Sequence, residues 1–243
     1  MARAAVLGRL NWLVAAVTEA VTETPRVRTL VLEVPGWSGH RAGQHVDVRL
    51  TAEDGYQAER SYSVASAPGE PLALTVERLD DGEVSPYLVD EVVPGDRFEL
   101  RGPIGGYFVW APDGAADPVF LVAGGSGIVP LMSMLRLRRA AASTVPAKLL
   151  YSSRTLDDVI YRDELPNIGA EVVQTLTREQ PPGWQGYARR VDIDLLREVA
   201  YPPERNPRVF VCGPTNFVEA VAEGLVALGH RPGRIRTERF GGT

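Results

Sequence analysis

The chain has 243 residues, of which 44% are hydrophobic and 23% are charged, so a disordered chain is excluded and one large domain or two of ordinary size are expected. Its single cysteine, Cys212, excludes an intramolecular disulfide, and it also excludes a four-cysteine zinc site or iron–sulfur cluster held by this chain alone. The 26 basic and 31 acidic residues do not suggest nucleic-acid binding. No apolar stretch approaches the ~20 residues of a membrane span, and residues 1–10 lack the apolar region of a signal peptide, so we expect a soluble cytoplasmic protein.

The first half of the chain has the pattern of β structure. Short segments rich in Val, Leu, Thr and Arg are separated by turn dipeptides such as Asp54-Gly55 and Pro94-Gly95. Residues 29–34 alternate with the period of a half-buried strand. Strands at this spacing predict an antiparallel barrel or sandwich. The predicted strands cover residues 13–22, 26–34, 44–50, 60–66, 71–79 and 96–101.

Near residues 111–114 the composition changes, and the second half alternates strand, turn and helix patterns. Such alternation predicts a parallel sheet of βαβ units, and a ligand that bridges the two halves would lie at their interface. We therefore expect a β domain over residues 12–110 and an α/β domain over residues 114–243. The predicted strands of the second half are 119–123, 148–152, 171–176 and 209–212, and the predicted helices are 130–141, 157–165, 192–200 and 215–228.

The run from Arg60 to Val64 carries the strongest signal of the first half. Strand alternation places Arg60, Tyr62 and Val64 on one face, and Ser61 and Ser63 on the other. A guanidinium can pair with a phosphate and an aromatic ring can stack on a planar group, so this strand suits an anionic aromatic ligand. The alternative is an ordinary amphipathic strand.

A glycine motif opens the second half. Gly125 and Gly127 follow a predicted strand and precede a predicted helix, which is the context that a dinucleotide motif requires. Such glycines let the backbone approach a pyrophosphate, and the helix N-terminus supplies N–H donors. Pro130 stands where the dinucleotide fingerprint has its third glycine, and proline suits a first helical turn. The alternative is a tight strand-to-helix turn that binds nothing.

Two polar pairs follow the next two predicted strands. Ser153-Arg154 and Thr177-Arg178 lie past the carboxyl ends of these strands, where the ligands of parallel sheets bind. Arginines at this edge can pair with the 2′-phosphate of NADP, whereas a site selective for NAD more often presents a carboxylate. We therefore expect NADPH, and NADH is the alternative if both arginines are ordinary solvated side chains.

These motifs resemble, in order and spacing, those of the ferredoxin–NADP reductase family. The resemblance covers about residues 12–243 and includes the Arg-x-Tyr-Ser, Gly-x-x-Ser, Gly-Gly-x-Gly-x-x-Pro, Cys-Gly-Pro and terminal Glu-x-aromatic elements of that family. It implies an antiparallel six-stranded flavin-binding barrel followed by a parallel-sheet α/β nucleotide-binding domain. It also implies an FAD-dependent enzyme that transfers a hydride from NAD(P)H, in which the protein binds and orients the cofactors.

The resemblance implies a role for each matched residue. Ser63 would hydrogen-bond near the flavin N5, Cys212 would set the geometry of hydride transfer, and Glu238 would be an acid or hydrogen-bond partner near N5. Taken without the resemblance, Cys212 is a buried residue before a tight turn, and Glu238 lies in a free C-terminal strand end. FAD would be bound by Arg60, Ser61, Tyr62, Ser63, Val64, Gly82, Val84, Ser85 and Phe240. NADP would be bound by Gly125, Gly127, Pro130, Ser153, Arg154, Thr177, Arg178, Cys212, Gly213 and Pro214.

The electron acceptor is open. Because a plant-type cluster needs four cysteines, we expect electrons to leave the chain for a separate protein such as a ferredoxin, a flavodoxin or an oxygenase component. A non-catalytic regulatory subunit and a reductase of free flavin are the alternatives, and FMN in place of FAD is also left open. His40 and His45 have no further ligands nearby in the sequence, so we expect no metal site. Arg136, Arg138 and Arg139 form a basic stripe, which is usually a solvated helix face and less often a dock for an acidic partner.

Overall fold

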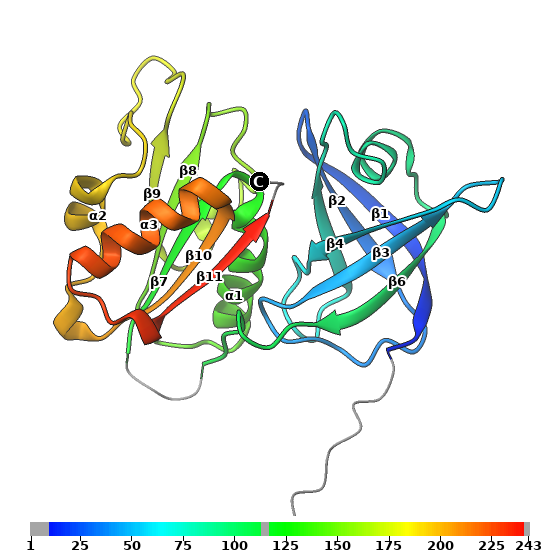
Figure 1. Cartoon of the computed structure of the whole chain (residues 1–243), viewed down its shortest axis with the longest axis horizontal. Helices are drawn as coiled ribbons and strands as arrows, with labels where there is room; N and C mark the ends of the chain where they lie inside the picture. The colour runs from blue at the N-terminus through cyan, green and yellow to red at the C-terminus, as the bar shows by residue number, and fades with distance from the viewer. Residues whose placement is uncertain (1–9, 113–116, 241–243) are drawn as a thin grey trace, which may run out of the picture.

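The computed structural model of the chain describes residues 10–112 and 117–240. An all-β half and an α/β half lie side by side, and helix α1 (Ile128–Ala140) lies between the second sheet and the barrel (Figure 1). The order is the one that the sequence predicts. Residues 114–116 and 241–243 of the expected α/β domain lie outside the described part of the chain.

The first half is an antiparallel sheet with the strand order β4-β3-β6-β1-β2-β5. A bridge between Val64 and Leu74 joins its two edges, so the sheet closes into a barrel and leaves no long unpaired edge. Inward side chains such as Leu30 and Leu100 are fully buried, and the π-helix η1 (Tyr87–Glu91) adds Leu88 to this core. The strands are β1 (Trp12–Thr24), β2 (Val27–Glu33), β3 (His45–Thr51), β4 (Gln57–Ser63), β5 (Leu72–Glu77) and β6 (Arg97–Ile104).

The second half is a parallel sheet with the strand order β11-β10-β7-β8-β9. Helix α1 covers the face toward the barrel, whereas α2 (Ile193–Val199) and α3 (Thr215–Ala227) cover the other face (Figure 1). The strands are β7 (Val119–Gly124), β8 (Ala147–Ser153), β9 (Glu171–Leu176), β10 (Arg208–Pro214) and β11 (Ile235–Phe240). Short 3-10 turns are η2 (Gly125–Gly127), η3 (Leu165–Asn167), η4 (Pro203–Arg205) and η5 (Pro232–Arg234).

The helix predicted over residues 157–165 is wrong. This segment forms irregular turns that lead into η3. Tyr161 has a φ of 58°, a left-handed conformation that an α-helix cannot continue. Val159, Ile160 and Tyr161 are all buried, and three consecutive side chains cannot face one core from a helix. Tertiary packing has therefore overridden the local helical pattern.

The order in which successive strands join the sheet reverses between β7 and β10. The helix that follows β7 crosses one face of the sheet, and the helix that follows β10 crosses the other, so a crevice opens at their carboxyl ends. Here Gly127 passes so close to β10 that a Cβ on it would lie 2.1 Å from the carbonyl oxygen of Cys212. Only glycine fits at this crossing, which explains the motif at the level of packing.

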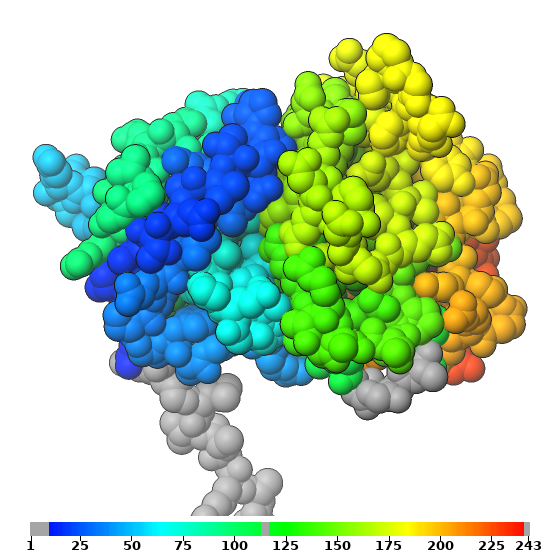
Figure 2. All heavy atoms as spheres, turned by 180° about the vertical axis from the view of Figure 1, so that it is seen from behind, coloured from blue at the N-terminus to red at the C-terminus, as the bar shows by residue number. Residues whose placement is uncertain are grey.

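The two halves share a hydrophobic core. One cluster of buried side chains combines Ala42, Ala65 and Ala73 of the first half with the buried face of α1. Phe108 meets Phe210 of β10 edge-on, with ring centroids 5.4 Å apart. From behind, the surfaces of the two halves meet along a continuous boundary (Figure 2). No helix in residues 10–112 or 117–240 is long and apolar enough to cross a membrane.

Candidate functional site

A cavity of about 260 Å³ lies where the barrel meets the carboxyl ends of β10 and β11. Ser63 enters it from the end of β4, Cys212 from β10 and Glu238 from β11. Cys212 and Glu238 are register partners in neighbouring parallel strands. Three residues that are far apart in the sequence, and that it singles out as catalytic candidates, therefore line one space. The full lining is His45, Ser61, Ser63, Cys212, Glu238, Arg239 and Phe240.

Burial favours the protonated form of both the acid and the thiol of this cavity. Burial raises the pKa of Glu238 to about 7, and its Oε2 has no hydrogen-bond partner among the described residues. Cys212 is 2% exposed, and burial, with the nearby Glu238 charge, raises its pKa well above the ordinary value. Glu238 can therefore hold or release a proton near neutral pH. Cys212 remains a neutral thiol and is not a thiolate nucleophile.

His45 is a lining residue that the sequence does not single out as a site residue. It pairs with Ser63 across strands β3 and β4, and this register brings its ring to the cavity. Burial lowers the pKa of His45, although the charge of Asp47 opposes this effect. Asp47 accepts hydrogen bonds from Ser61 and Arg101, both at 2.7 Å. Burial alone would raise the pKa of Asp47, but these bonds lower it, so a fixed negative charge supports this side of the cavity.

The two predicted flavin elements of the barrel lie together. Arg60 Nη2 is 2.9 Å from a carboxylate oxygen of Glu83, which lies within the Gly82–Ser85 turn, and Tyr56 donates to the other oxygen at 2.7 Å. A groove of about 640 Å³ continues from Tyr56 and Glu83 to Tyr87 and Arg49. The Arg60–Glu83 ion pair thus lies at a groove that is lined by the exposed rings of Tyr56 and Tyr87.

Several residues that are predicted to bind flavin instead pack in the barrel core or form hydrogen bonds within the barrel. Val64 and Val84 are fully buried in the barrel core, and Tyr62 packs half-buried against the same core. The hydroxyl of Ser85 accepts a hydrogen bond from the Leu79 backbone N–H at 3.0 Å. Of the alternating faces of β4, the one with Ser61 and Ser63 therefore lines the cavity. On the other face, Tyr62 and Val64 turn toward the barrel core, whereas Arg60 is exposed and pairs with Glu83.

A cleft of about 570 Å³, larger than the cavity at Ser63, opens at the carboxyl ends of β7, β8 and β9. Its lining includes the predicted nucleotide residues Gly125, Ser153, Arg154, Thr177, Arg178 and Pro214. It also includes residues that the sequence does not single out: Arg26, Glu77, Asp158, Arg190, Asn216 and Phe217. Gly127, Pro130 and Gly213 lie behind this surface and shape the loop rather than line the cleft.

The arginines of the cleft differ in how they are held. Arg154 pairs with Asp158 at 3.1 Å, and Asp158 also accepts hydrogen bonds from Thr155. The guanidinium groups of Arg178 and Arg190 have no hydrogen-bond or ion-pair partner in residues 10–112 and 117–240. Two unpaired cations therefore face the cleft. The other two arginines of its lining are paired, Arg154 with Asp158 and Arg26 with Asp80.

Phe240 lines both spaces, so it lies between the nucleotide cleft and the cavity of Ser63, Cys212 and Glu238. A dinucleotide in the cleft would reach the cavity past this ring. Within the described ranges no group of three His, Cys, Asp or Glu side chains could hold a metal ion. His40 instead contacts the carbonyl oxygen of Ser66 at 3.1 Å.

Comparison with known proteins follows the same division of the chain. The profile of the Oxidoreductase FAD-binding domain matches residues 15–109, and that of the Oxidoreductase NAD-binding domain matches residues 121–223. Over 192 residues the chain is 37% identical to ferredoxin–NADP reductase B of Sorangium cellulosum, with coverage of 75% of this chain and 77% of that protein. The chain belongs to the ferredoxin–NADP reductase family.

Other members of this family are similar over more of the chain. A glycine betaine monooxygenase reductase subunit of Chromohalobacter salexigens is 31% identical over 236 residues, which are 93% of this chain and 63% of that protein. The chain thus spans less than two thirds of that relative. The solved cytochrome P450 reductase GcoB of Amycolatopsis superposes with a TM-score of 0.83 at 28% identity, over 97% of this chain and 72% of that one.

Membership of the family fits the observed site. The chain carries an oxidoreductase FAD-binding domain and an oxidoreductase NAD-binding domain, and its fold is the predicted barrel followed by the α/β unit. The orphaned carboxylate oxygen of Glu238 is a buried polar atom that a bound ring system can satisfy. On the barrel side, the cavity at Ser63 and the groove at Glu83, the ion-pair partner of Arg60, are the two spaces that are open to a ligand.

Proposed function

We propose that the chain is an NADPH-dependent reductase that moves a hydride to FAD and passes electrons one at a time to a separate acceptor protein. The observation that carries this proposal is the meeting of Ser63, Cys212 and Glu238 in one cavity beside the nucleotide cleft. Bound FAD supplies the conversion between two-electron and one-electron transfer. The residues of the chain bind and orient the cofactors, and they hold the proton that is transferred.

Each cavity residue has a distinct task in this proposal. The Ser63 hydroxyl would donate a hydrogen bond to the edge of the flavin. Cys212, a neutral buried thiol, fills the floor of the nicotinamide site and sets its distance from the flavin. Glu238 holds a proton at its carboxyl near neutral pH and can exchange it with the flavin edge. Arg60 would leave Glu83 to pair with a flavin phosphate, and the groove that Glu83 lines would be open to the rest of the cofactor.

The proposed preference for NADPH rests on the charge of the cleft. Arg178 and Arg190 are available to a 2′-phosphate, because neither is paired within the described ranges. Arg154 contributes less than the sequence suggests, since Asp158 already neutralises it. The carboxylate of Asp158 in the same cleft is the observation that favours NADH as the second candidate, because it can accept from a free 2′-hydroxyl.

The proposed acceptor is a one-electron carrier outside this chain. Two of the similar proteins are named as reductases of a monooxygenase and of a cytochrome P450, which supports an oxygenase component or the ferredoxin that serves one. A flavodoxin is a further member of this class. A regulatory subunit without activity would not need the assembled cavity, and a reductase of free flavin would hold FAD weakly.

The proposal is tested by identifying the bound flavin and then the acceptor. Mass analysis of the cofactor released from the purified protein should give FAD. Ferredoxins, flavodoxins, cytochrome c and free flavin should then be assayed side by side with NADPH. We expect the iron–sulfur or flavodoxin acceptors to be reduced fastest. A protein that neither binds flavin nor reduces any acceptor would refute the proposal, and fastest reduction of free flavin would replace it with the diffusible-flavin alternative.

A further inference from the structure

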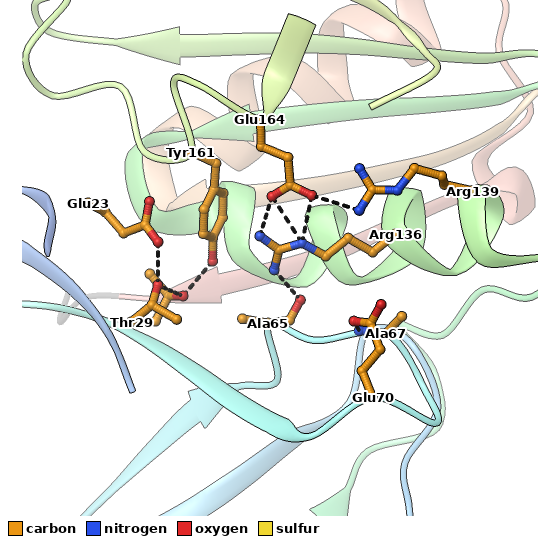
Figure 3. A network of polar contacts seen from close by, with 10 residues as sticks. Glu23, Thr29, Ala65, Ala67, Glu70, Arg136, Arg139, Tyr161 and Glu164 are labelled. Carbon is orange, nitrogen blue, oxygen red and sulfur yellow. Dashed lines mark hydrogen bonds and ion pairs between the residues drawn. The ribbon is translucent and has the colours of Figure 1, made fainter. Parts of the chain in front are cut away.

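Helix α1 connects the nucleotide loop to the strand that carries Ser63. The helix begins directly after η2, and two of its side chains reach the barrel segment that follows β4. Ser133 Oγ donates a hydrogen bond to the carbonyl oxygen of Ser66 at 2.6 Å. Arg136 Nη1 donates to the carbonyl oxygen of Ala65 at 2.7 Å (Figure 3). Both carbonyl groups lie within three residues of Ser63, so one rigid helix spans the two binding sites.

The Arg136 guanidinium is fixed on several sides. It donates through Nε and Nη2 to the carboxylate of Glu164, with a shortest distance of 2.5 Å, and it lies 4.5 Å from the ring centre of Tyr161. Its side chain is 14% exposed. Burial alone would raise the pKa of Glu164, but hydrogen bonds and charge from Arg136 and Arg139 lower it. The ion pair is therefore charged, partly desolvated and directional.

A second polar link runs beside the first. The hydroxyl of Tyr161 donates to Thr75 on β5 at 2.5 Å, and Thr75 shares a hydrogen bond of 2.8 Å with Thr29 on β2. Thr29 also donates to Glu23 at 2.7 Å (Figure 3). The left-handed backbone at Tyr161, which ends the local helical pattern, is what turns this ring toward the barrel. The link is buried, since Tyr161 is 3% exposed.

We propose that Arg136, together with Glu164 and Tyr161, is a positioning device for hydride transfer. The shared apolar core holds the two halves together but is not directional, whereas these hydrogen bonds fix their register. Arg136 would thus hold the nucleotide loop at a set distance from Ser63. Arg136 is a positioning residue, because it lines neither the cleft nor the cavity. The inference rests on the proposed function.

The test compares Arg136→Met with Arg139→Met. Arg139 is on the same helix and also pairs with Glu164, at 3.1 Å, but it is 47% exposed and makes no hydrogen bond or ion pair with the barrel in the described ranges. The two variants remove the same charge and keep an apolar stem of similar length. Only Arg136→Met removes the bond to Ala65, so differences between the variants report the link between the halves.

The first readout needs no cofactor. In the FAD-free protein, amide hydrogen exchange should accelerate in residues 64–67 and in the second half of α1 for Arg136→Met, and it should stay unchanged for Arg139→Met. Exchange in β1 and β6, on the far side of the barrel, should not change in either variant. Unchanged exchange at residues 64–67 in Arg136→Met would overturn the proposal, even if the proposed reaction proves wrong.

The second readout uses the FAD-loaded protein. For Arg136→Met, the limiting rate of flavin reduction by NADPH should fall at least about tenfold, since a misplacement of about 1 Å can cost on the order of 100-fold. The dissociation constant for NADPH and the FAD content should change little, and the charge-transfer absorbance with NADP should weaken. A wild-type limiting rate in Arg136→Met would refute positioning. If that variant does not fold, Tyr161→Phe and Arg136→Lys decide, and wild-type rates in both would contradict the proposal.

Discussion

The structural and functional roles of the buried residue Cys212 can be distinguished by experiment. Because it lines the cavity as a neutral thiol, Cys212→Ala should keep the flavin spectrum and slow flavin reduction by NADPH in stopped flow. The loss should reach on the order of 100-fold if the nicotinamide shifts by about 1 Å. Cys212→Ser, which nearly preserves the size, should lose less. A loss of about 1 kcal/mol in the free energy of unfolding, seen as a lowered melting temperature, with an unchanged reduction rate would instead mark a purely structural thiol.

Glu238 makes stability depend on pH. Its pKa is about 7 in the folded protein and 4.5 in the unfolded chain, so between these values the folded state keeps a proton that the unfolded state has lost. The free energy of unfolding should therefore decrease by up to about 3 kcal/mol as pH rises through this window, and level off above it. In the FAD-free protein, Glu238→Gln should flatten this dependence. Parallel pH profiles of the melting temperature for wild type and variant would exclude this role.

Arg178 and Arg190 should set the preference between the two nucleotides. Loss of one charge-assisted contact to a 2′-phosphate costs about 1.5–3 kcal/mol, which corresponds to roughly 10–150-fold in kcat/KM for NADPH relative to NADH. Arg178→Ala and Arg190→Ala should each lower this ratio, and Arg154→Ala should lower it less because Asp158 already holds Arg154. An unchanged ratio in both of the first two variants would show that the cleft does not bind the phosphate there.

At the scale of elements, the crossing of η2 and β10 depends on a missing side chain. A Cβ on Gly127 would lie 2.1 Å from the Cys212 carbonyl oxygen, so Gly127→Ala must push the two segments apart. We expect a loss of roughly 1–3 kcal/mol in stability, typical of overpacking, together with weaker nucleotide binding. Gly106→Ala is the matched control, because nothing lies within 4 Å of its added Cβ. Equal melting temperatures for the two variants would contradict this packing.

The strands and motifs of this fold can be predicted from the sequence because they depend on local periodicity and turns. The six barrel strands and the βαβ order are confirmed, whereas the helix at 157–165 is wrong because burial of Tyr161 against the barrel overrides local preference. His45 was missed since only the β3–β4 register brings it beside Ser63. Arg190 was missed because it lies in an irregular segment without a strand-end signal. The roles of the matched site residues remain predictions.

At the scale of the whole molecule, the basic stripe of Arg136, Arg138 and Arg139 on α1 shows that a sequence pattern does not predict contacts between the two halves. Arg136 belongs neither to a solvated face nor to an open dock, because it joins the two halves. Arg138 likewise donates hydrogen bonds to the Val145 and Gly169 carbonyl oxygens. A helical stripe does not reveal which residues meet a second domain, since that contact joins segments about 70 residues apart. The shared core makes the two halves act as a single unit around the cavity.

The most direct test of this account is anaerobic reduction of the purified, FAD-loaded protein by NADPH in a stopped-flow spectrometer. The account predicts that the flavin absorbance bleaches in a single turnover, faster with NADPH than with NADH, and that it returns when an oxidised one-electron acceptor protein is added. A bound flavin that neither nucleotide bleaches would contradict the claim that the cavity of Ser63, Cys212 and Glu238 is a site of hydride transfer.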